Sequence, residues 1–379
     1  MRLLMVSGDR QVALGERGPF YSMQAEFSRY FERVDVICPK PEGEIKVRQI
    51  HDNVHFHPAP VTRRGMVNYV TSKGAELIEQ HGHKLITSHD YGWFYNGVGS
   101  AHLSQRFKLP YLSELHHVPG VPVSANLRER FDRFVARTYV RWARNKAVAF
   151  RVVNQEEMPR ILKRWGVPEQ KILFLPSLYI DQEVFYPAPE GSAQELKYDV
   201  IFVGRMVPNK GLGRIVDALS LLARRGHTMR ALFVGRGPMR PVIESRAAMR
   251  DLDATFIDWV DSPSDLADLY RASRACICGS TCEGGPRYTV EAMACGTPTV
   301  STPVGVMSEL VGDGLAGGLV GWDPHAVAVA LERVLVDEDV RLEMGRLAVE
   351  RARPFEFHAT LANYANGLRR LAGEPEVQL

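Results

Sequence analysis

Two glutamates, Glu283 and Glu291, stand eight positions apart in a segment whose composition suits ligand binding. The residues between them read Gly-Gly-Pro-Arg-Tyr-Thr-Val, and Ala-Met-Ala-Cys-Gly-Thr-Pro298 follows. The Gly-Gly-Pro part predicts a turn that leads into a helix of small residues. Glycines let backbone N–H groups approach a ligand, a helix start favours an anion, and carboxylates accept hydrogen bonds from hydroxyls. The segment therefore suits a polyhydroxylated, anionic ligand, although the spacing alone is more often that of solvated glutamates beside a loop.

Basic and glycine-rich loops precede this segment at two predicted strand ends. The strand Asp199–Val203 runs into Gly204-Arg205-Met-Val-Pro-Asn-Lys210-Gly and then into a helix. Arg205 and Lys210 can reach one diphosphate from two sides of this loop. The next strand ends in Gly235-Arg-Gly-Pro, which is weak support by itself because such loops also serve as connectors. Successive strand ends thus carry glycine, basic, aromatic and acidic groups in order.

Short apolar runs alternate with helical patterns in two sets, which predicts parallel sheets with right-handed crossovers. We expect an α/β fold of two Rossmann-like, doubly wound domains that face a cleft at the carboxyl ends of their strands. The segment Tyr186–Gln194 has the composition of a linker between them. The expected strands are Arg2–Ser7, Val34–Cys38, Leu85–Ser88, Tyr111–Leu115 and Val148–Val153, then Asp199–Val203, Arg230–Val234, Ala254–Ile257, Ala275–Cys278 and Pro298–Ser301.

Composition excludes several classes of protein. The chain has 379 residues, of which 45% are hydrophobic and 24% charged, as in a globular protein of about two domains. No apolar run approaches the ~20 residues that span a bilayer, and the start Met1–Val6 reads as a strand rather than a signal peptide. We therefore expect a cytoplasmic protein.

Five cysteines form an odd set, which argues against a disulfide framework. Three of them cluster closely enough to suggest zinc, but the spacing is not that of a standard pair, and Ala-Cys-Ile-Cys-Gly reads as a buried strand. We expect no metal site. The cysteines are Cys38, Cys276, Cys278, Cys282 and Cys295.

An arginine stripe marks the segment Leu127–Lys146 in a chain of net charge +3. Its arginines recur at spacings of three and four, which places them on one helix face. Such a face is usually just solvated, and the sharper interpretation is a surface for an anionic membrane leaflet or a phosphate-bearing acceptor. No nucleic-acid motif accompanies it, so nucleic acid is not an expected partner. The arginines are Arg130, Arg133, Arg137, Arg141 and Arg144.

Residues from about Lys197 to Gly318 resemble the nucleotide-binding half of glycosyltransferase family 4, whose members are retaining enzymes of the GT-B fold. The matching segments are Phe-Val-Gly-Arg205 with Asn-Lys210-Gly, Phe-Val-Gly235-Arg-Gly-Pro, Asp-Trp259-Val260, and the run from Glu283 to Pro298. The first half matches more loosely, through Ser-Gly8 and Glu114-Leu-His116-His117. The resemblance implies a first domain of residues 1–188, completed by 355–379 with a crossover helix Phe357–Leu371, and a donor domain of residues 195–354.

The resemblance also implies roles for single residues. Arg205 and Lys210 grip the donor diphosphate, Glu283 orients the transferred sugar, and Glu291 accepts from the ribose hydroxyls. His116 is the active-site histidine, and its neighbour His117 makes this assignment ambiguous. The donor set is completed by Gly204, Gly235, Trp259, Val260, Gly284, Gly285 and Pro286, and the first-domain loop supplies Gly8, Gly15 or Gly18.

The implied activity is transfer of a hexose-type sugar from a UDP- or GDP-linked donor to a sugar, lipid-linked or small-molecule acceptor with retention of configuration. Glycan, glycolipid or cell-envelope polysaccharide synthesis is the expected setting, at the inner membrane face if the arginine stripe binds there. Two fixed cations on the diphosphate replace a metal ion, so no cofactor is expected. Arg287 departs from the family pattern and either adds a third cation or faces solvent, and Arg236 stands where an acidic residue is common.

Two alternatives stay open. One is an epimerase or hydrolase of the same fold, which would use the donor grip without an acceptor. The other is a catalytically inactive protein that binds nucleotide sugars. Release of epimerised or free sugar without acceptor would favour the first alternative.

Overall fold

The computed structural model describes residues 1–189 and 195–379, and these divide into two compact units. The first unit contains Met1–His116, Phe131–Ser177 and His358–Leu379, and the second contains His117–Arg130 and Leu178–Phe357. The expected linker Tyr186–Gln194 lies between the two sets of strands, and its last five residues are outside the described part.

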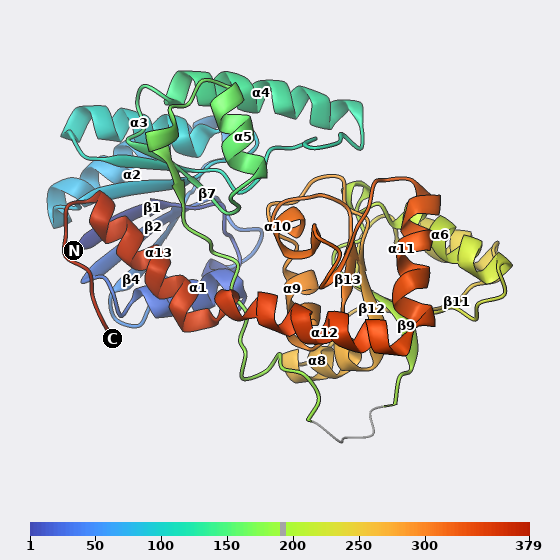
Figure 1. The fold of residues 1–379 in the computed structure, drawn as a ribbon. Helices are drawn as coiled ribbons and strands as arrows, with labels where there is room; N and C mark the ends of the chain where they lie inside the picture. Colours follow the sequence, from blue (N-terminus) through green and yellow to red (C-terminus); the bar gives the residue numbers. More distant parts are fainter. Residues whose placement is uncertain (190–194) are drawn as a thin grey trace. The chain divides into compact units, whose positions relative to one another are not determined.

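An eight-stranded sheet forms the centre of the first unit in the order β3-β4-β2-β1-β5-β6-β7-β8 (Figure 1). Every neighbouring pair is parallel except the edge pair β3 and β4. The strands are β1 (Arg2–Val6), β2 (Arg33–Cys38), β3 (Gln49–Ile50), β4 (Val54–Pro58), β5 (Leu85–His89), β6 (Tyr111–Glu114), β7 (Ala149–Val152) and β8 (Ile172–Phe174).

Helices cover the sheet of the first unit, as a parallel sheet requires. The closing helix α13 lies beside α1, and the rings of Phe27 and Tyr364 meet between them at 5.1 Å (Figure 1). The residues His358–Leu379 therefore belong to the first unit although they come last in the chain. The helices are α1 (Pro19–Phe27), α2 (Met66–His81), α3 (Tyr95–Phe107), α4 (Leu127–Ala143), α5 (Glu157–Arg164) and α13 (Phe357–Leu371).

The second unit has a six-stranded, fully parallel sheet in the order β11-β10-β9-β12-β13-β14. Its strands are β9 (Tyr198–Val203), β10 (Arg230–Val234), β11 (Asp253–Ile257), β12 (Ser273–Cys278), β13 (Thr299–Ser301) and β14 (Gly317–Leu319). Its helices are α6 (Leu212–Arg224), α7 (Arg240–Ala248), α8 (Pro263–Arg271), α9 (Arg287–Ala294), α10 (Met307–Val311), α11 (Pro324–Val336) and α12 (Glu338–Ala352). None of the described helices in either unit is long and apolar enough to cross a bilayer.

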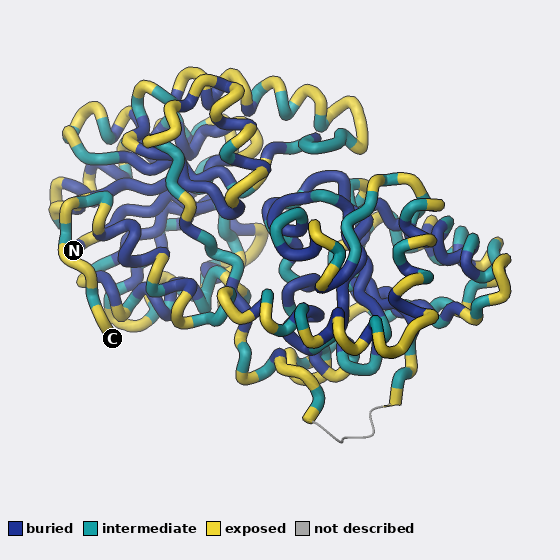
Figure 2. Tube along the Cα trace, viewed as in Figure 1, coloured by how far each residue is buried: buried dark blue, intermediate teal, exposed yellow. Residues whose placement is uncertain are grey.

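The central strands are apolar along almost their whole length because helices shield both faces, and Figure 2 shows them in the buried colour. This pattern is why all ten expected strands are found with ends shifted by at most two residues. The expectation of two parallel-sheet α/β domains is confirmed. Cys276 and Cys278 lie in β12, and all five cysteines, each within the described residues, are buried and form no disulfide.

A buried carboxyl group sits inside the first unit where β5 ends. Asp90 accepts hydrogen bonds from four hydroxyls, those of Ser88, Tyr111, Ser113 and Tyr139. Tyr139 comes from α4, so the cluster joins this helix to the sheet. Burial raises the pKa of Asp90 to about 7 because it outweighs the four hydrogen bonds, which act in the opposite direction.

This carboxyl predicts a pH-dependent stability. The folded-state pKa is higher than the unfolded value of 3.8, so the stability it contributes at low pH is lost as the pH rises through about 7. Asp90→Asn mimics the protonated group and should remove a loss of at most about 3 kcal/mol between pH 5 and pH 8. Urea unfolding at both pH values measures it, with the exposed Asp52→Asn as control. An unchanged pH slope in Asp90→Asn would contradict the assignment.

Candidate active site

Glycine lets three strand-end loops of the second unit come together. The loops follow β9, β10 and β12, and β9 lies between the other two strands. A Cβ at Gly235 would lie 2.1 Å from the carbonyl oxygen of Gly204, and one at Gly211 would lie 2.0 Å from that of Gly279. Both positions also have left-handed φ values, +137° and +67°. Only glycine fits there, so the backbones of the loops touch.

Lys210 and Glu283 form an ion pair between two of these loops. Lys210 ends a short 3-10 turn, Pro208–Lys210, and its Nζ contacts Glu283 Oε1. Ser280 Oγ donates to the same oxygen at 3.2 Å, and the ring of Tyr288 lies 5.7 Å from the ammonium group. Only 12% of the lysine side chain and 18% of the glutamate side chain are exposed, so each charge is well shielded and has a partner. The two residues expected to hold diphosphate and sugar are therefore brought together.

Backbone hydrogen bonds hold the same two loops in register. Thr281 N donates to Asn209 O at 2.8 Å, and Asn209 Nδ2 donates to Cys282 O at 3.2 Å. Arg205 stands exposed just after β9 on the same strand-end edge. Lys210 is thus positioned by its neighbours, whereas Arg205 can move to meet a ligand.

His117 belongs to the second unit and lies close to this pair of loops. Val118, the next residue, accepts a hydrogen bond from Cys282 Sγ at 3.1 Å, and Val123 N donates to Thr281 O at 3.3 Å. Partial desolvation lowers the pKa of His117 although the ring still reaches solvent, and the charges that act on it are those of Glu283, Lys210 and Arg205. The histidine that the sequence left as a source of ambiguity is therefore a neighbour of the donor residues.

Glu291 lies on the second turn of α9, and two protein side chains contact its carboxylate. It accepts from Tyr270 Oη at 3.0 Å, and Arg287 Nε lies 3.3 Å from its other oxygen. Burial raises the pKa of Glu291, while Arg287 and Tyr270 oppose this shift. Arg287 also donates to Tyr179 O and stacks over the Tyr179 ring at 4.1 Å. Arg287 is thus neither free for a third phosphate contact nor simply solvated, because the i,i+4 spacing pairs it with Glu291.

The Gly-Gly-Pro turn leads directly into α9, which begins at Arg287. A Cβ at Gly285 would make an ordinary 3.4 Å contact with Leu178, and its φ is not left-handed. The local fold therefore does not require glycine at 285. The expected contact of Gly284, Gly285 and Pro286 with a donor stays a prediction.

The segment after β11 presents Trp259 with 71% of its surface exposed, and Val260 beside it packs on the core of the second unit. Asp258 pairs with Arg236 at 3.2 Å and also with Arg240. The unusual arginine of the Gly235 loop therefore has a structural partner on the neighbouring strand end. Trp259 is free to stack on a planar ligand without first leaving a core.

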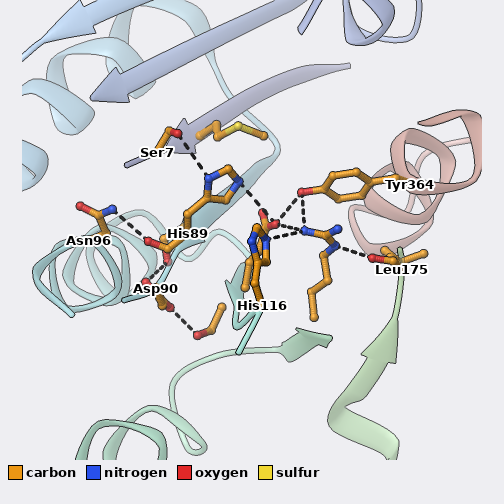
Figure 3. Close-up of polar contacts among 12 residues, drawn as sticks. Ser7, His89, Asp90, Asn96, His116, Leu175 and Tyr364 are labelled. Atoms are coloured by element: carbon orange, nitrogen blue, oxygen red, sulfur yellow. Dashed lines mark hydrogen bonds and ion pairs between the residues drawn. The ribbon is translucent and has the colours of Figure 1, made fainter. Parts of the chain in front are cut away.

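A second cluster lies in the first unit at the ends of β5, β6 and β7 (Figure 3). The register aligns His89 with Glu114 and Glu114 with Arg151. Arg151 Nη1 donates to Glu114 Oε2 at 2.6 Å and to His116 Nε2 at 3.2 Å. The hydroxyl of Tyr364 from α13 also contacts Arg151 Nη1, at 3.1 Å, and donates to Glu114. His116 is thus tied to a buried charged network that the sequence did not reveal.

The charges of this network compensate one another. Burial alone would raise the pKa of Glu114, but His89, Arg151 and the Tyr364 hydroxyl hold it well below its usual range, at about 2. Arg151 is fully buried, its Nε donates to Leu175 O at 2.7 Å, and its guanidinium lies 3.7 Å from the Tyr364 ring centroid. A charged arginine inside a parallel strand needs such partners.

The three glycines expected in the first-unit loops differ in role. Gly8 follows β1, and a Cβ there would lie 2.4 Å from the Tyr91 ring, so it allows a close approach of that side chain. Gly15 ends a 3-10 turn with a left-handed φ of +89°. Gly18 directly precedes α1, and a Cβ there would make an ordinary 3.5 Å contact with Gln11 Oε1. Their contact with a ligand stays a prediction.

A cavity of about 380 Å³ opens in the first unit beyond the ends of β2 and β4. Three of its lining side chains are cationic: Arg10, Lys40 and Arg63. Arg10 pairs with Glu42 at 3.0 Å. Within residues 1–189 and 195–379, no carboxylate lies within 4.0 Å of Lys40 or Arg63. The cavity is therefore electropositive.

Two family models match the chain in consecutive segments. The glycosyl transferase 4-like domain matches residues 20–177, and the glycosyl transferases group 1 domain matches residues 197–337. These segments include Lys210, Glu283 and Glu291 of the second unit and His89, Glu114, His116 and Arg151 of the first, whereas Tyr179 and Tyr364 lie outside them.

Among curated proteins, the relatives include D-inositol 3-phosphate glycosyltransferases. That of Gordonia bronchialis is 35% identical over 216 residues, which are 51% of this chain and 46% of the relative. That of Kribbella flavida is 28% identical over 326 residues, which are 79% of this chain and 75% of the relative. The match thus spans about half the length of the first relative and three quarters of the second.

Solved structures resemble the whole chain. A sucrose-phosphate synthase from Thermosynechococcus elongatus has a TM-score of 0.80 and 22% identity, with 98% of this chain and 99% of that chain covered. Anabaena HepE, solved with UDP and glucose, has a TM-score of 0.74 and 19% identity, with 98% and 100% covered. These likenesses confirm the GT-B fold expected from the sequence. The two family models, which match consecutive segments over most of the chain, show that the chain belongs to the glycosyltransferase family 4 type.

Proposed function

We propose that the chain transfers a hexose-type sugar from a UDP- or GDP-linked donor to a hydroxyl acceptor, with retention of configuration. The observation that carries this proposal is the ion pair of Lys210 and Glu283, which brings a cation and a carboxylate together on glycine-built loops. Arg205 on the same edge can supply a second positive charge. The cytoplasmic location and the role in glycan, glycolipid or envelope polysaccharide synthesis belong to the same proposal.

Arg205 and Lys210 take the place of a metal ion in this proposal. Negative charge develops on the leaving diphosphate during sugar transfer, and fixed donors stabilise it without reorganisation. A diphosphate is a stronger anion than a single carboxylate, so it can draw Lys210 from Glu283. The glutamate is then available to accept hydrogen bonds from the sugar hydroxyls. Reaction then takes place on one face of the sugar, and the leaving phosphate takes the acceptor proton.

Ribose binding to Glu291 requires a change of partners. Arg287 and Tyr270 already contact this carboxylate, so a ribose would replace at least one of them. Arg287 can keep its contact with Tyr179 when it leaves Glu291. The nucleotide base would stack on exposed Trp259.

A test of the donor site is transfer by Lys210→Met with UDP- and GDP-linked sugars and a panel of acceptors. We expect kcat to fall by about 10²–10³-fold because one charge on the leaving diphosphate is lost. Lys197→Met, an exposed lysine of the same unit, is the matched control. Addition of a chelator should leave the wild-type rate unchanged.

Three outcomes would contradict this proposal. An undiminished rate in Lys210→Met would remove Lys210 from the diphosphate site. Sugar release or epimerisation without acceptor would favour the hydrolase or epimerase. Donor binding without any turnover would favour an inactive binding protein.

We infer that the acceptor carries an anionic group, such as a phosphomonoester. The electropositive cavity of the first unit offers Lys40 and Arg63 without a carboxylate partner among the described residues. Its position past the strand ends is where ligands bind in parallel sheets. Arg10 adds a third cation, which is paired with Glu42, also in the lining, at 3.0 Å.

Arg63→Gln should raise the acceptor KM by about tenfold for a phosphorylated polyol, since one charge-assisted contact is lost. The neighbouring Arg64 does not line the cavity, so Arg64→Gln is the control. Initial rates with a phosphorylated acceptor and its dephosphorylated form measure the effect. Equal KM values for both acceptor forms in the wild type would contradict an anionic acceptor.

We infer further that α4 contacts an anionic membrane surface. Its buried side is Ala136, Tyr139, Val140 and Ala143, so Phe131 and Phe134 point outward, 51% and 65% exposed. Trp93, 65% exposed, meets Phe131 edge-on at 5.9 Å. Exposed aromatics beside an arginine stripe suit a lipid headgroup region better than plain solvent.

Arg137→Ala with Arg141→Ala should weaken binding to vesicles that contain anionic lipid by about 2 kcal/mol in total, or roughly 30-fold. Arg160→Ala on α5 is the control because this arginine is exposed outside the stripe. Co-sedimentation with anionic and with zwitterionic vesicles measures the affinity. If the wild type binds neither vesicle, or both equally, the arginine stripe is only a solvated face.

A further inference from the structure

Arg151 divides one nitrogen among three acceptors, which is unusual for an arginine paired with a carboxylate. Its Nη1 contacts Glu114 Oε2, His116 Nε2 and the Tyr364 hydroxyl (Figure 3). Within the described residues, Arg151 Nη2 and Glu114 Oε1 make no hydrogen bond although both are buried. Arginine–carboxylate pairs are frequently bidentate, with two nitrogens and two oxygens engaged, and this pair is not. The arrangement instead aims the guanidinium at the histidine.

The contact between Arg151 and His116 fixes the state of the imidazole. A guanidinium has donors only and stays protonated, so the 3.2 Å contact to Nε2 requires a lone pair on that nitrogen. His116 is therefore neutral, and its ring proton is on Nδ1. The ring then has no lone pair left with which to take a proton from a substrate hydroxyl.

A metal ion is not a competing explanation for the cluster. The possible ligand atoms of His89, Glu114 and His116 do lie within 4.8 Å of one another. However, Arg151 already contacts two of these three groups. A divalent cation there would stand against a buried guanidinium, and the two charges would repel each other strongly.

We propose that Arg151 is a positioning residue that holds His116 as the neutral Nδ1–H tautomer, so that His116 acts as a hydrogen-bond donor and not as the general base. This inference rests on the proposed function, for which the family resemblance implies that His116 is the active-site histidine. Tyr364 of the closing helix α13 helps to hold Arg151 in position, because its ring lies against the guanidinium and its hydroxyl donates to Glu114.

The direct test is nitrogen NMR of the wild-type protein, with the His116 signals assigned by their loss in His116→Asn. Nδ1 should give the signal of a protonated ring nitrogen and Nε2 that of an unprotonated one. A proton on Nε2, or on both nitrogens at pH 7, would overturn the proposal. This measurement does not depend on knowing the substrates.

Two variants test the role in the reaction. Arg151→Lys keeps a charge for Glu114, and Arg151→Met with Glu114→Gln replaces the pair with neutral groups, which guards against loss of folding. Both should give His116 a mixture of tautomers and lower kcat on the order of 10²-fold with little change in donor KM. Arg369→Lys is the matched control, since Arg369 is a buried arginine of α13 that donates to Tyr30 O and Pro375 O.

The outcomes separate this inference from the proposed function. If the double variant folds and keeps both the wild-type tautomer and the wild-type kcat, Arg151 is only structural. If no donor is turned over by the wild type, the transferase proposal fails, and the NMR signals still decide whether Arg151 fixes the histidine.

Discussion

The ion pair of Lys210 and Glu283 is the interaction on which the proposed donor site depends. Two charges that are almost shielded from water need partners, and these two residues satisfy each other across neighbouring loops. Gly211 supports this pair, because the absence of a Cβ there lets the loop after β9 touch the loop after β12 at Gly279. The pair holds both side chains in position before a ligand binds. In the proposed reaction, Lys210 would then move to the diphosphate and Glu283 to the sugar, so that binding changes the partners of buried charges and buries no new charge.

The first unit uses the same edge of a parallel sheet in a different way. Its strand register places His89, Glu114 and Arg151 side by side, and the closing helix adds Tyr364. Here the charges are fully buried, and their compensation holds the pKa of Glu114 near 2. We thus propose different roles for the two pairs. Lys210 and Glu283 of the second unit exchange partners when a donor binds, whereas Arg151, paired with Glu114 in the first unit, fixes the tautomer of His116.

The elements and residues that could be predicted are those that a short stretch of sequence specifies by itself. Apolar runs located the ten main strands, and the strand-end loops located Arg205, Lys210 and Glu283. The strands β4 and β14 were not expected, because Val-His-Phe-His-Pro alternates polar residues and Gly-Gly-Leu lacks β-branched residues. The pairing of Arg287 with Glu291 could have been predicted from its i,i+4 spacing.

The role of Arg151 could not be predicted, because its partners Glu114 and Tyr364 are 37 and 213 residues away in the sequence. A charged residue inside the apolar run of β7 was the one local signal. Which side of α4 faces the core also depends on tertiary packing, so the exposure of Phe131 and Phe134 could not be predicted from the sequence.

The central claim is that the strand-end loops of the second unit hold a nucleoside diphosphate by charge and by stacking. Calorimetric titration of UDP and of GDP into the full chain tests it most directly. The account predicts one-to-one binding of at least one of the two nucleotides, with an affinity that falls as salt is added because Arg205 and Lys210 supply the attraction. Absence of binding by both nucleotides, or an affinity that is insensitive to salt, would contradict the account.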